Sequence, residues 1–196
     1  MAAESFITNI AIFASGTGSN TQKIIDHFRS NKKTKIALIV SNRPGSGVLQ
    51  IAEKENIPFL VLGRDKFFRG NAYLDELKEK KINFIVLAGF LWKVPAALTE
   101  AYSGKMINLH PALLPKYGGK GMYGLRVHEE VIASGDKESG ISIHYVDPLY
   151  DHGQLIFQAK CRVEETDTPE SLAKKIQLLE HAHFPRIIEE LTTSKI

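Results

Sequence analysis

The sequence predicts an α/β fold, a three-layer αβα domain with a doubly wound, mostly parallel sheet and a C-terminal antiparallel portion. In the first half of the chain, short and nearly continuous apolar runs alternate with helix-like segments, which is typical of parallel strands covered on both faces. In the second half, two alternating runs separated by a short loop indicate an antiparallel hairpin. A chain of 196 residues is long enough for one such domain.

The β-α-β order of the first half comes from apolar runs and helical periodicity. Strands are expected at 8–15, 34–41, 57–63, 82–90 and 105–110. Helices are expected between them at about 19–31, 46–55 and 71–80. The first helix brings Ile24, Ile25 and Phe28 onto one apolar stripe. Right-handed crossovers would then join the strands into one parallel sheet.

After residue 105 the pattern changes. A short helix is expected at 124–134, and the hairpin strands are expected at 139–147 and 154–163. The last helix is expected to start at Pro169, which suits the first helical position, with Thr168 as N-cap. Pro185 lies inside its apolar periodicity and is expected to kink or end this helix.

Charge and composition do not indicate an extended nucleic-acid-binding surface. The chain is 43% hydrophobic and 24% charged, with a net charge of +3. Lysines and arginines are dispersed, without the long basic runs of a nucleic-acid-binding surface. We therefore expect no nucleic-acid partner.

The sequence predicts a cytoplasmic protein. Cys161 is the one cysteine, so no intramolecular disulfide can form, and a reducing compartment is expected. The N-terminus "MAAESFITN" lacks the basic and apolar regions of a signal peptide. No apolar run approaches the roughly 18 residues that a membrane helix needs. We expect Cys161 to be a small core residue and the protein to have no membrane partner.

A glycine-rich loop, "SGTGSN", follows the first strand and opens the first helix. Unpaired N–H groups at a helix start attract anions, and glycines allow close approach, so Gly16 to Asn20 are expected to cradle a phosphate. Two details count against a dinucleotide fingerprint: Thr21 stands in place of its third glycine, and no acidic residue ends the second strand. The alternative is a tight turn in which Ser19 or Asn20 caps the helix.

The segment "NLHPALLP" places Asn108 and His110 on the same side of the fifth strand's end. There they could both donate hydrogen bonds to one developing oxyanion, and His110 could also move protons. No serine or cysteine nucleophile stands nearby, so the nucleophile would belong to the substrate. Asp151 is the first candidate for a carboxylate partner and Asp147 the second. The alternative is that Asn108 caps the loop and His110 is a hydrogen-bonded core residue.

No metal site is expected. His144 and His152, or His181 and His183, do not reproduce a zinc-binding pattern.

The segments "FASGTGSN", "VLAGFLWKV", "NLHPALLPKYGGKG", "SGISIHYVDPLYDHGQLIFQ" and "QLLEHAHFP" resemble the glycinamide ribonucleotide formyltransferases, folate-dependent enzymes of purine synthesis. The resemblance runs in order from about residue 8 to residue 190. It implies a Rossmann-like fold and transfer of a formyl group from 10-formyltetrahydrofolate, the co-substrate, to the amine of glycinamide ribonucleotide. These two small molecules would be the partners of a monomer or homodimer.

The resemblance also implies a role for each matching residue. Asn108 and His110, the latter as imidazolium, would stabilise the oxyanion, and Asp151 would relay the proton through an ordered water. His144 would be a supporting residue. The implied contacts to the ribonucleotide and its phosphate are Gly16, Thr17, Gly18, Ser19, Asn20, Gln177 and Glu180. The implied contacts to the folate are Trp92, Lys93, Val94, Asn108, Asp147 and Asp151.

The single domain 1–196 would then have two functional halves. Residues 1–105 would bind the phosphate and nucleotide, and residues 106–196 would bind folate and carry the catalytic groups. The sequence departs from the family at two places. Leu91 and Trp92 follow "LAGF", where the family often has basic or small residues, and the loop up to His128 differs from the family's histidine-containing version.

Three other functions compete with this one. A formyltetrahydrofolate deformylase would use water in place of the amine, but its extra N-terminal domain has no room before residue 8. Methionyl-tRNA formyltransferase would need a C-terminal nucleic-acid-binding domain. A noncatalytic nucleotide-binding module would use the glycine loop alone and has no need for Asn108, His110 and Asp151 together.

Overall fold

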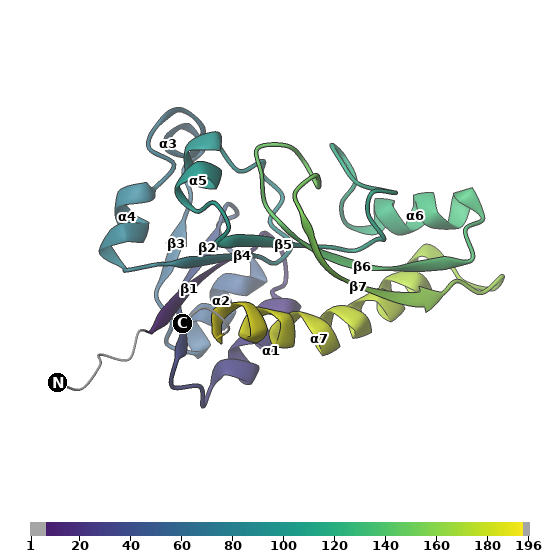
Figure 1. Cartoon of the computed structure of the whole chain (residues 1–196), viewed down its shortest axis with the longest axis horizontal. Helices are drawn as coiled ribbons and strands as arrows, with labels where there is room; N and C mark the ends of the chain where they lie inside the picture. Colours follow the sequence, from purple (N-terminus) through teal and green to yellow (C-terminus); the bar gives the residue numbers. More distant parts are fainter. Residues whose placement is uncertain (1–6, 194–196) are drawn as a thin grey trace.

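A seven-stranded mixed sheet runs through the computed structural model, which describes residues 7–193 (Figure 1). The strands are β1 Thr8–Phe13, β2 Thr34–Ser41, β3 Phe59–Val61, β4 Phe84–Leu87, β5 Met106–His110, β6 Glu138–Tyr145 and β7 Leu155–Arg162. Their order across the sheet is β3-β2-β1-β4-β5-β6-β7. The neighbours from β3 to β5 pair in parallel, and β5–β6 and β6–β7 pair antiparallel. The predicted fold class is confirmed.

Helices connect and cover these strands. They are α1 Ser19–Phe28, α2 Gly47–Lys54, α3 Arg64–Arg69, α4 Leu74–Glu79, α5 Ala96–Ala101, α6 Leu125–Ser134 and α7 Pro169–Thr193. Five of them lie in or near the predicted ranges. The six-residue helices α3 and α5 were not predicted, because fewer than two turns give too few positions for an apolar period.

The sheet separates two hydrophobic clusters. Successive residues of a strand point to opposite faces, so Ile10 and Ile12 of β1 join one cluster while Ala11 and Phe13 join the other. Helices α1, α2, α6 and α7 contribute to the first cluster, and α3, α4 and α5 contribute to the second. Burial on both faces explains why the parallel strands appear as continuous apolar runs.

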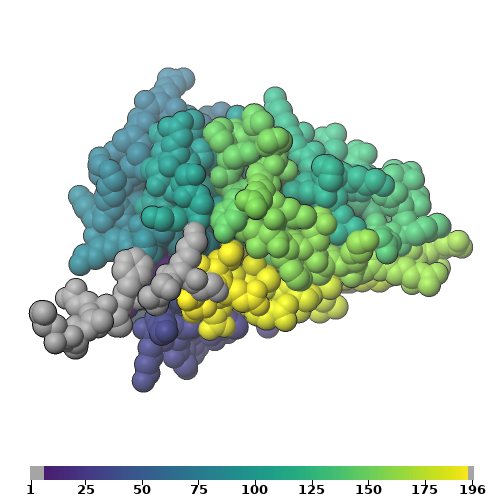
Figure 2. Space-filling view, viewed as in Figure 1, coloured from purple at the N-terminus to yellow at the C-terminus, as the bar shows by residue number. Residues whose placement is uncertain are grey.

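Helix α7 is the longest element and closes the first cluster. Thr168 caps it: the Ser171 N–H donates to Thr168 Oγ1 at 3.2 Å, and the Thr168 N–H donates to Ser171 Oγ at 2.9 Å. The surface of α7, yellow-green to yellow, runs beside the green β6–β7 hairpin (Figure 2). Within residues 7–193, no helix is long and apolar enough to cross a membrane.

The prediction that Pro185 could end the last helix is wrong, because α7 continues to Thr193. A proline in a helix interior costs about 3 kcal/mol. Phe184, Ile187 and Ile188 around it are all buried, and each such side chain contributes about 1.5–3 kcal/mol on burial. Burial therefore outweighs the lost backbone hydrogen bond.

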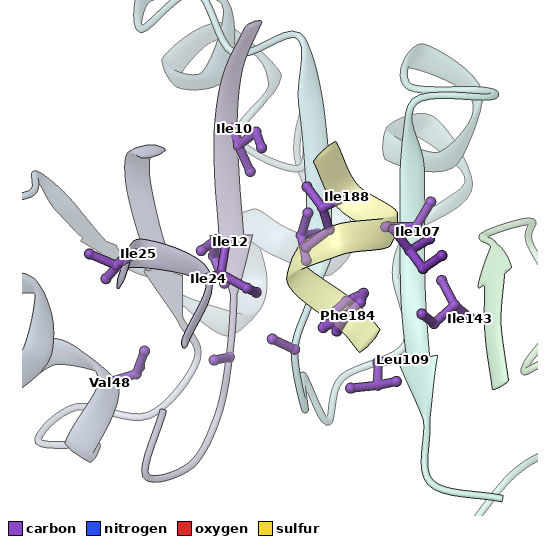
Figure 3. Packing of buried hydrophobic residues seen from close by; sticks show 14 of the residues in the cluster. Ile10, Ile12, Ile24, Ile25, Val48, Ile107, Leu109, Ile143, Phe184 and Ile188 are labelled. Carbon is purple, nitrogen blue, oxygen red and sulfur yellow. The ribbon is translucent and has the colours of Figure 1, made fainter. Parts of the chain in front are cut away.

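Phe184 offers a test of this packing. It is 0% exposed and belongs to the same cluster as Ile107 and Leu109 of β5 (Figure 3). We predict that Phe184→Ala lowers the free energy of unfolding by about 3–5 kcal/mol in denaturant titrations, because it leaves a cavity. Leu178→Ala on the same helix, where the leucine is 70% exposed, should change it by no more than about 0.5 kcal/mol. Equal losses in the two variants would contradict this packing.

Candidate active site

A cavity of about 670 Å³ opens at the carboxyl ends of β4 and β5. It lies beside the switch point between β1 and β4, where the chain has moved outward through β2 and β3 and then returned to the other side of β1. Such crevices are the usual ligand sites of doubly wound sheets. The predicted site residues that line it are Asn20, Trp92, Lys93, Val94, Asn108, His110, His144, Asp147, Asp151, Gln177 and Glu180.

Strand pairing places Asn108 directly opposite His144. The His144 Nδ1 is 2.8 Å from the carbonyl oxygen of Tyr145, which can only accept, so Nδ1 carries the hydrogen. In the neutral ring Nε2 is then an acceptor, and the Asn108 side-chain amide donates to it at 3.1 Å. The same amide lies 3.4 Å from Asp151 Oδ1. His144 thus orients the Asn108 amide.

His110 is buried, with 3% of its surface exposed. Its Nε2 donates to the carbonyl oxygen of Tyr117 at 2.8 Å, so the neutral ring has no hydrogen on Nδ1. This Nδ1 lies 3.6 Å from Asp151 Oδ1. Burial lowers the pKa of His110 below its ordinary value, and the Asp151 charge and the Tyr117 carbonyl partly oppose that effect. A proton on Nδ1 would therefore be held beside a negative charge.

Asp151 lies on the loop between β6 and β7, and its side chain is 12% exposed. Besides the His110 ring, its Oδ1 lies 3.7 Å from His144 Nε2, and its Oδ2 accepts the Gly119 N–H at 2.9 Å. Burial alone raises the pKa of Asp151, but the two histidines and the Gly119 N–H outweigh burial and hold that pKa below its usual range. The carboxylate is therefore ionised beside the two rings, and it is Asp151 rather than Asp147 that lies against His110.

The glycine loop turns sharply into α1. Gly18 is the N-cap residue with φ of 83°, and no side chain caps this helix, so the alternative in which Ser19 or Asn20 caps it is wrong. A Cβ on Gly18 would approach the Val48 backbone to 3.0 Å, so the turn requires glycine. The uncapped first turn leaves its N–H groups available to an anion.

The side chains of the loop turn toward α7. The Asn20 amide donates to Glu180 Oε2 at 2.8 Å, and the Gln177 amide donates to Ser19 Oγ at 3.2 Å. Burial raises the pKa of Glu180, and the Asn20 hydrogen bond partly offsets this. Of the five loop residues, only Asn20 lines the cavity, whereas residues 16–19 lie outside its lining.

Trp92 stands in an aromatic group on the wall formed by the segment after β4. Its ring centroid lies 5.3 Å from that of Phe68 and 5.7 Å from that of Phe67. The Arg64 guanidinium lies over the rings of Phe68 and Trp92. The side chain of Trp92 is therefore packed against α3 and also borders the cavity.

The formyl transferase family model matches residues 8–188, nearly the whole of the described chain. The chain belongs to the formyl transferase family.

Similar proteins carry related names. A chloroplastic phosphoribosylglycinamide formyltransferase of Arabidopsis thaliana is 35% identical over 193 residues, which cover 95% of this chain and 66% of the plant protein. The trifunctional purine biosynthetic protein adenosine-3 of Drosophila melanogaster is 36% identical, over 93% of this chain and 14% of its own length. The chain thus spans just under two thirds of the plant relative and a small part of the insect one.

Solved structures share the fold over nearly their full length. The phosphoribosylglycinamide formyltransferase from Bacillus halodurans superimposes with a TM-score of 0.86 and 36% identity, covering 96% of this chain and 97% of that one. The glycinamide ribonucleotide transformylase 1 from Geobacillus kaustophilus gives 0.85 and 34%, covering 95% and 99%.

In this formyl transferase the sequence pattern missed one wall of the cavity. Residues 119–124 of the glycine-rich loop line it together with Leu125 and His128 of α6. The Tyr117 carbonyl that binds His110 lies in the same loop. A run rich in glycine signals a loop but says nothing about what the loop packs against.

Within residues 7–193 no group of three or more His, Cys, Asp or Glu side chains is arranged to hold a metal ion.

The protonation of His110 gives a test of the site's electrostatics. We predict that NMR titration places its pKa below 6.5 because the ring is buried. Asp151→Asn should lower it further, since the carboxylate is what favours the charged ring. His183 of α7, whose ring packs on Phe157, is the control and should titrate alike in both proteins. A rise of the His110 pKa in the variant would contradict the assignment.

Proposed function

We propose that this formyl transferase moves the formyl group of 10-formyltetrahydrofolate to the amine of glycinamide ribonucleotide. The products are formylglycinamide ribonucleotide and tetrahydrofolate, a step of purine biosynthesis. One observation carries the proposal: Asn108, His110 and Asp151 converge in a cavity that, among residues 7–193, is lined by no serine, threonine or cysteine. A site with groups for an oxyanion and a proton, but no such nucleophile of its own, suits a substrate that brings the nucleophile.

The two substrates would enter from opposite sides of the cavity. The phosphate of the ribonucleotide would lie on the N–H groups of residues 16–20, with Gln177 and Glu180 of α7 contacting the rest of that substrate. The folate would lie against Trp92, Lys93 and Val94 and the loop that carries Asp147 and Asp151. The formyl carbon and the amine would then meet beside Asn108 and His110.

Side chains of the site can carry out each step of the formyl transfer. The amine nitrogen attacks the formyl carbon, forming the new C–N bond and an oxyanion. The Asn108 amide and a protonated His110 Nδ1 stabilise that oxyanion, and a partly buried cavity strengthens both interactions. Asp151 takes the proton that the amine loses. The bond from the formyl carbon to the folate nitrogen then breaks, and this nitrogen receives the proton from Asp151.

His110 must change its protonation state for this role. In the free protein burial favours the neutral ring, whose Nε2–H donates to the Tyr117 carbonyl oxygen, so Nδ1 must take up a proton from solvent. A negative oxyanion next to Nδ1 favours the imidazolium in the same way that Asp151 does. The strongest interaction thus forms when charge develops on the substrate, as catalysis requires.

The two halves of the chain have different roles in binding and catalysis. Residues 1–105 bind mainly the phosphate and nucleotide, and residues 106–196 bind folate and supply the catalytic groups. The halves are parts of one domain, because Gln177 and Glu180 come from the second half and Trp92 to Val94 from the first. We further propose that the enzyme is cytoplasmic, which agrees with its single cysteine, and that it acts as a monomer or homodimer.

The direct test is an absorbance assay of folate turnover by the purified protein. We expect tetrahydrofolate to form only when glycinamide ribonucleotide is present, at a rate that EDTA does not change. Turnover that continues without the amine would instead identify a deformylase. No turnover under any condition would overturn the transferase assignment and favour a noncatalytic binding module.

Substitutions test the catalytic roles. His110→Ala and Asp151→Asn should each lower kcat by about 100-fold or more, since oxyanion stabilisation and proton transfer each supply at least that factor. Both variants should still unfold cooperatively. Leu178→Ala, an exposed position on α7, is the activity control. A near-normal rate in either active-site variant would contradict the mechanism.

A further inference from the structure

The loop between β6 and β7 holds Asp151 in an unusual backbone conformation. Asp151 has φ of 48°, in the left-handed region that residues other than glycine adopt at a cost. Gly153, two residues later, has no room for a Cβ, which would stand 1.8 Å from the Tyr145 carbonyl oxygen. The loop is therefore tightly folded, and contacts within it must keep Asp151 in this conformation.

One pair of side chains closes this loop. The Asp147 Oδ2 lies 2.7 Å from His152 Nδ1, and its Oδ1 accepts the Leu149 N–H at 2.8 Å. A carboxylate can only accept, so His152 Nδ1 carries the hydrogen in either charge state of the ring. The pair joins the residue at the start of the loop to the residue directly after Asp151. Both oxygens of Asp147 are thus engaged within the loop.

Other contacts tie the same loop to the walls of the cavity. The Asp151 Oδ2 accepts the Gly119 N–H at 2.9 Å. The Lys93 ammonium lies 5.6 Å from the ring centroid of Tyr150, and both residues line the cavity. A shift of the loop would therefore move the Asp151 carboxylate and the Leu149 and Tyr150 side chains, which line the cavity.

We propose that Asp147 and His152 are positioning residues. Their hydrogen bond clamps the β6–β7 loop, so that Asp151 is held against His110 and the loop keeps the shape against which the folate would lie. The inference rests on the proposed function and adds a role for His152. The resemblance implied folate contact for Asp147, whereas this proposal has Asp147 act through the loop. The pair is partly exposed, with side chains 33% and 67% accessible, so it modulates the reaction rather than enabling it.

Three substitutions at one position separate the clamp from a general loss of structure. His152→Ala removes the donor. His152→Asn keeps an N–H donor where Nδ1 stands, while His152→Gln moves the donor one bond farther out. Lys160→Ala is the matched control, because Lys160 and Glu138 form an exposed ion pair of 2.9 Å at the other end of the same hairpin.

We expect His152→Ala to lower kcat/KM for the formylfolate about three- to fivefold, the range of an exposed charged hydrogen bond. The KM for the ribonucleotide, bound at the glycine loop, should stay unchanged. His152→Asn should restore kcat/KM to within about twofold of the wild type, and His152→Gln should resemble the alanine variant. Lys160→Ala should match the wild type.

A second measurement reads the loop without turnover. The Gly119 amide is bound to Asp151, so its hydrogen exchange reports whether the carboxylate stays in place. We expect faster exchange in His152→Ala and near-normal exchange in His152→Asn. If the wild type transfers no formyl group, the proposed function fails. The hydrogen exchange of the Gly119 amide then still tests whether the Asp147–His152 pair holds the loop.

Two results would overturn the clamp. One is a His152→Ala enzyme with wild-type kinetics and unchanged Gly119 exchange. The other is a His152→Asn enzyme as impaired as His152→Ala, because the donor at the δ position would then be irrelevant.

Discussion

The carboxylate of Asp151, whose side chain is only 12% exposed, is the constraint around which the site is arranged. A charge with so little exposure to water is costly unless hydrogen-bond donors reach it, and here the Gly119 N–H donates at 2.9 Å and the Asn108 amide at 3.4 Å. Its neighbours come from three separate parts of the chain: Asn108 and His110 at the end of β5, His144 at the end of β6, and the Gly119 N–H from the glycine-rich loop. The need to satisfy one charge thus ties two strands and two loops into a single polar cluster.

The reversal of strand direction between β5 and β6 makes this cluster possible. Four parallel ladders bring the glycine loop, the end of β4 and the end of β5 to one edge of the sheet. The antiparallel β6 then starts at the opposite edge and ends at this one, so His144 meets Asn108 and the following loop delivers Asp151. Ser15 joins the parallel part of the edge: its Oγ donates to Asn42 at 2.6 Å and accepts the Leu91 N–H at 2.9 Å. The strand end that leads into the glycine loop is thereby joined to the segment that precedes Trp92.

Local patterns predicted well those features that local interactions decide. The parallel strands and their order of appearance follow from apolar runs, and the start of α7 at Pro169 follows from its Thr168 cap. Prediction was wrong or silent where distant contacts dominate. Helix α7 passes Pro185 because its neighbours are buried by the sheet, and α3 and α5 are too short to show a period. Among the site residues, Asn108 and His110 were recognisable from their spacing and strand position, but the Tyr117 carbonyl and residues 119–125 carry no chemical signature.

The sequence by itself determined the α/β class, the alternation of strands and helices, and the residues able to stabilise an oxyanion or move a proton. These depend on side-chain type and on periodicity over a few residues. Only the tertiary structure decided that Asp151 rather than Asp147 meets His110, that Asp147 pairs with His152, and that the Nδ1 of His110 lies toward Asp151. The first outcome depends on how the β6–β7 loop folds back over the end of β5, because residues about 40 positions apart meet only when the sheet is assembled. The other two depend on how the β6–β7 loop and the glycine-rich loop fold on themselves.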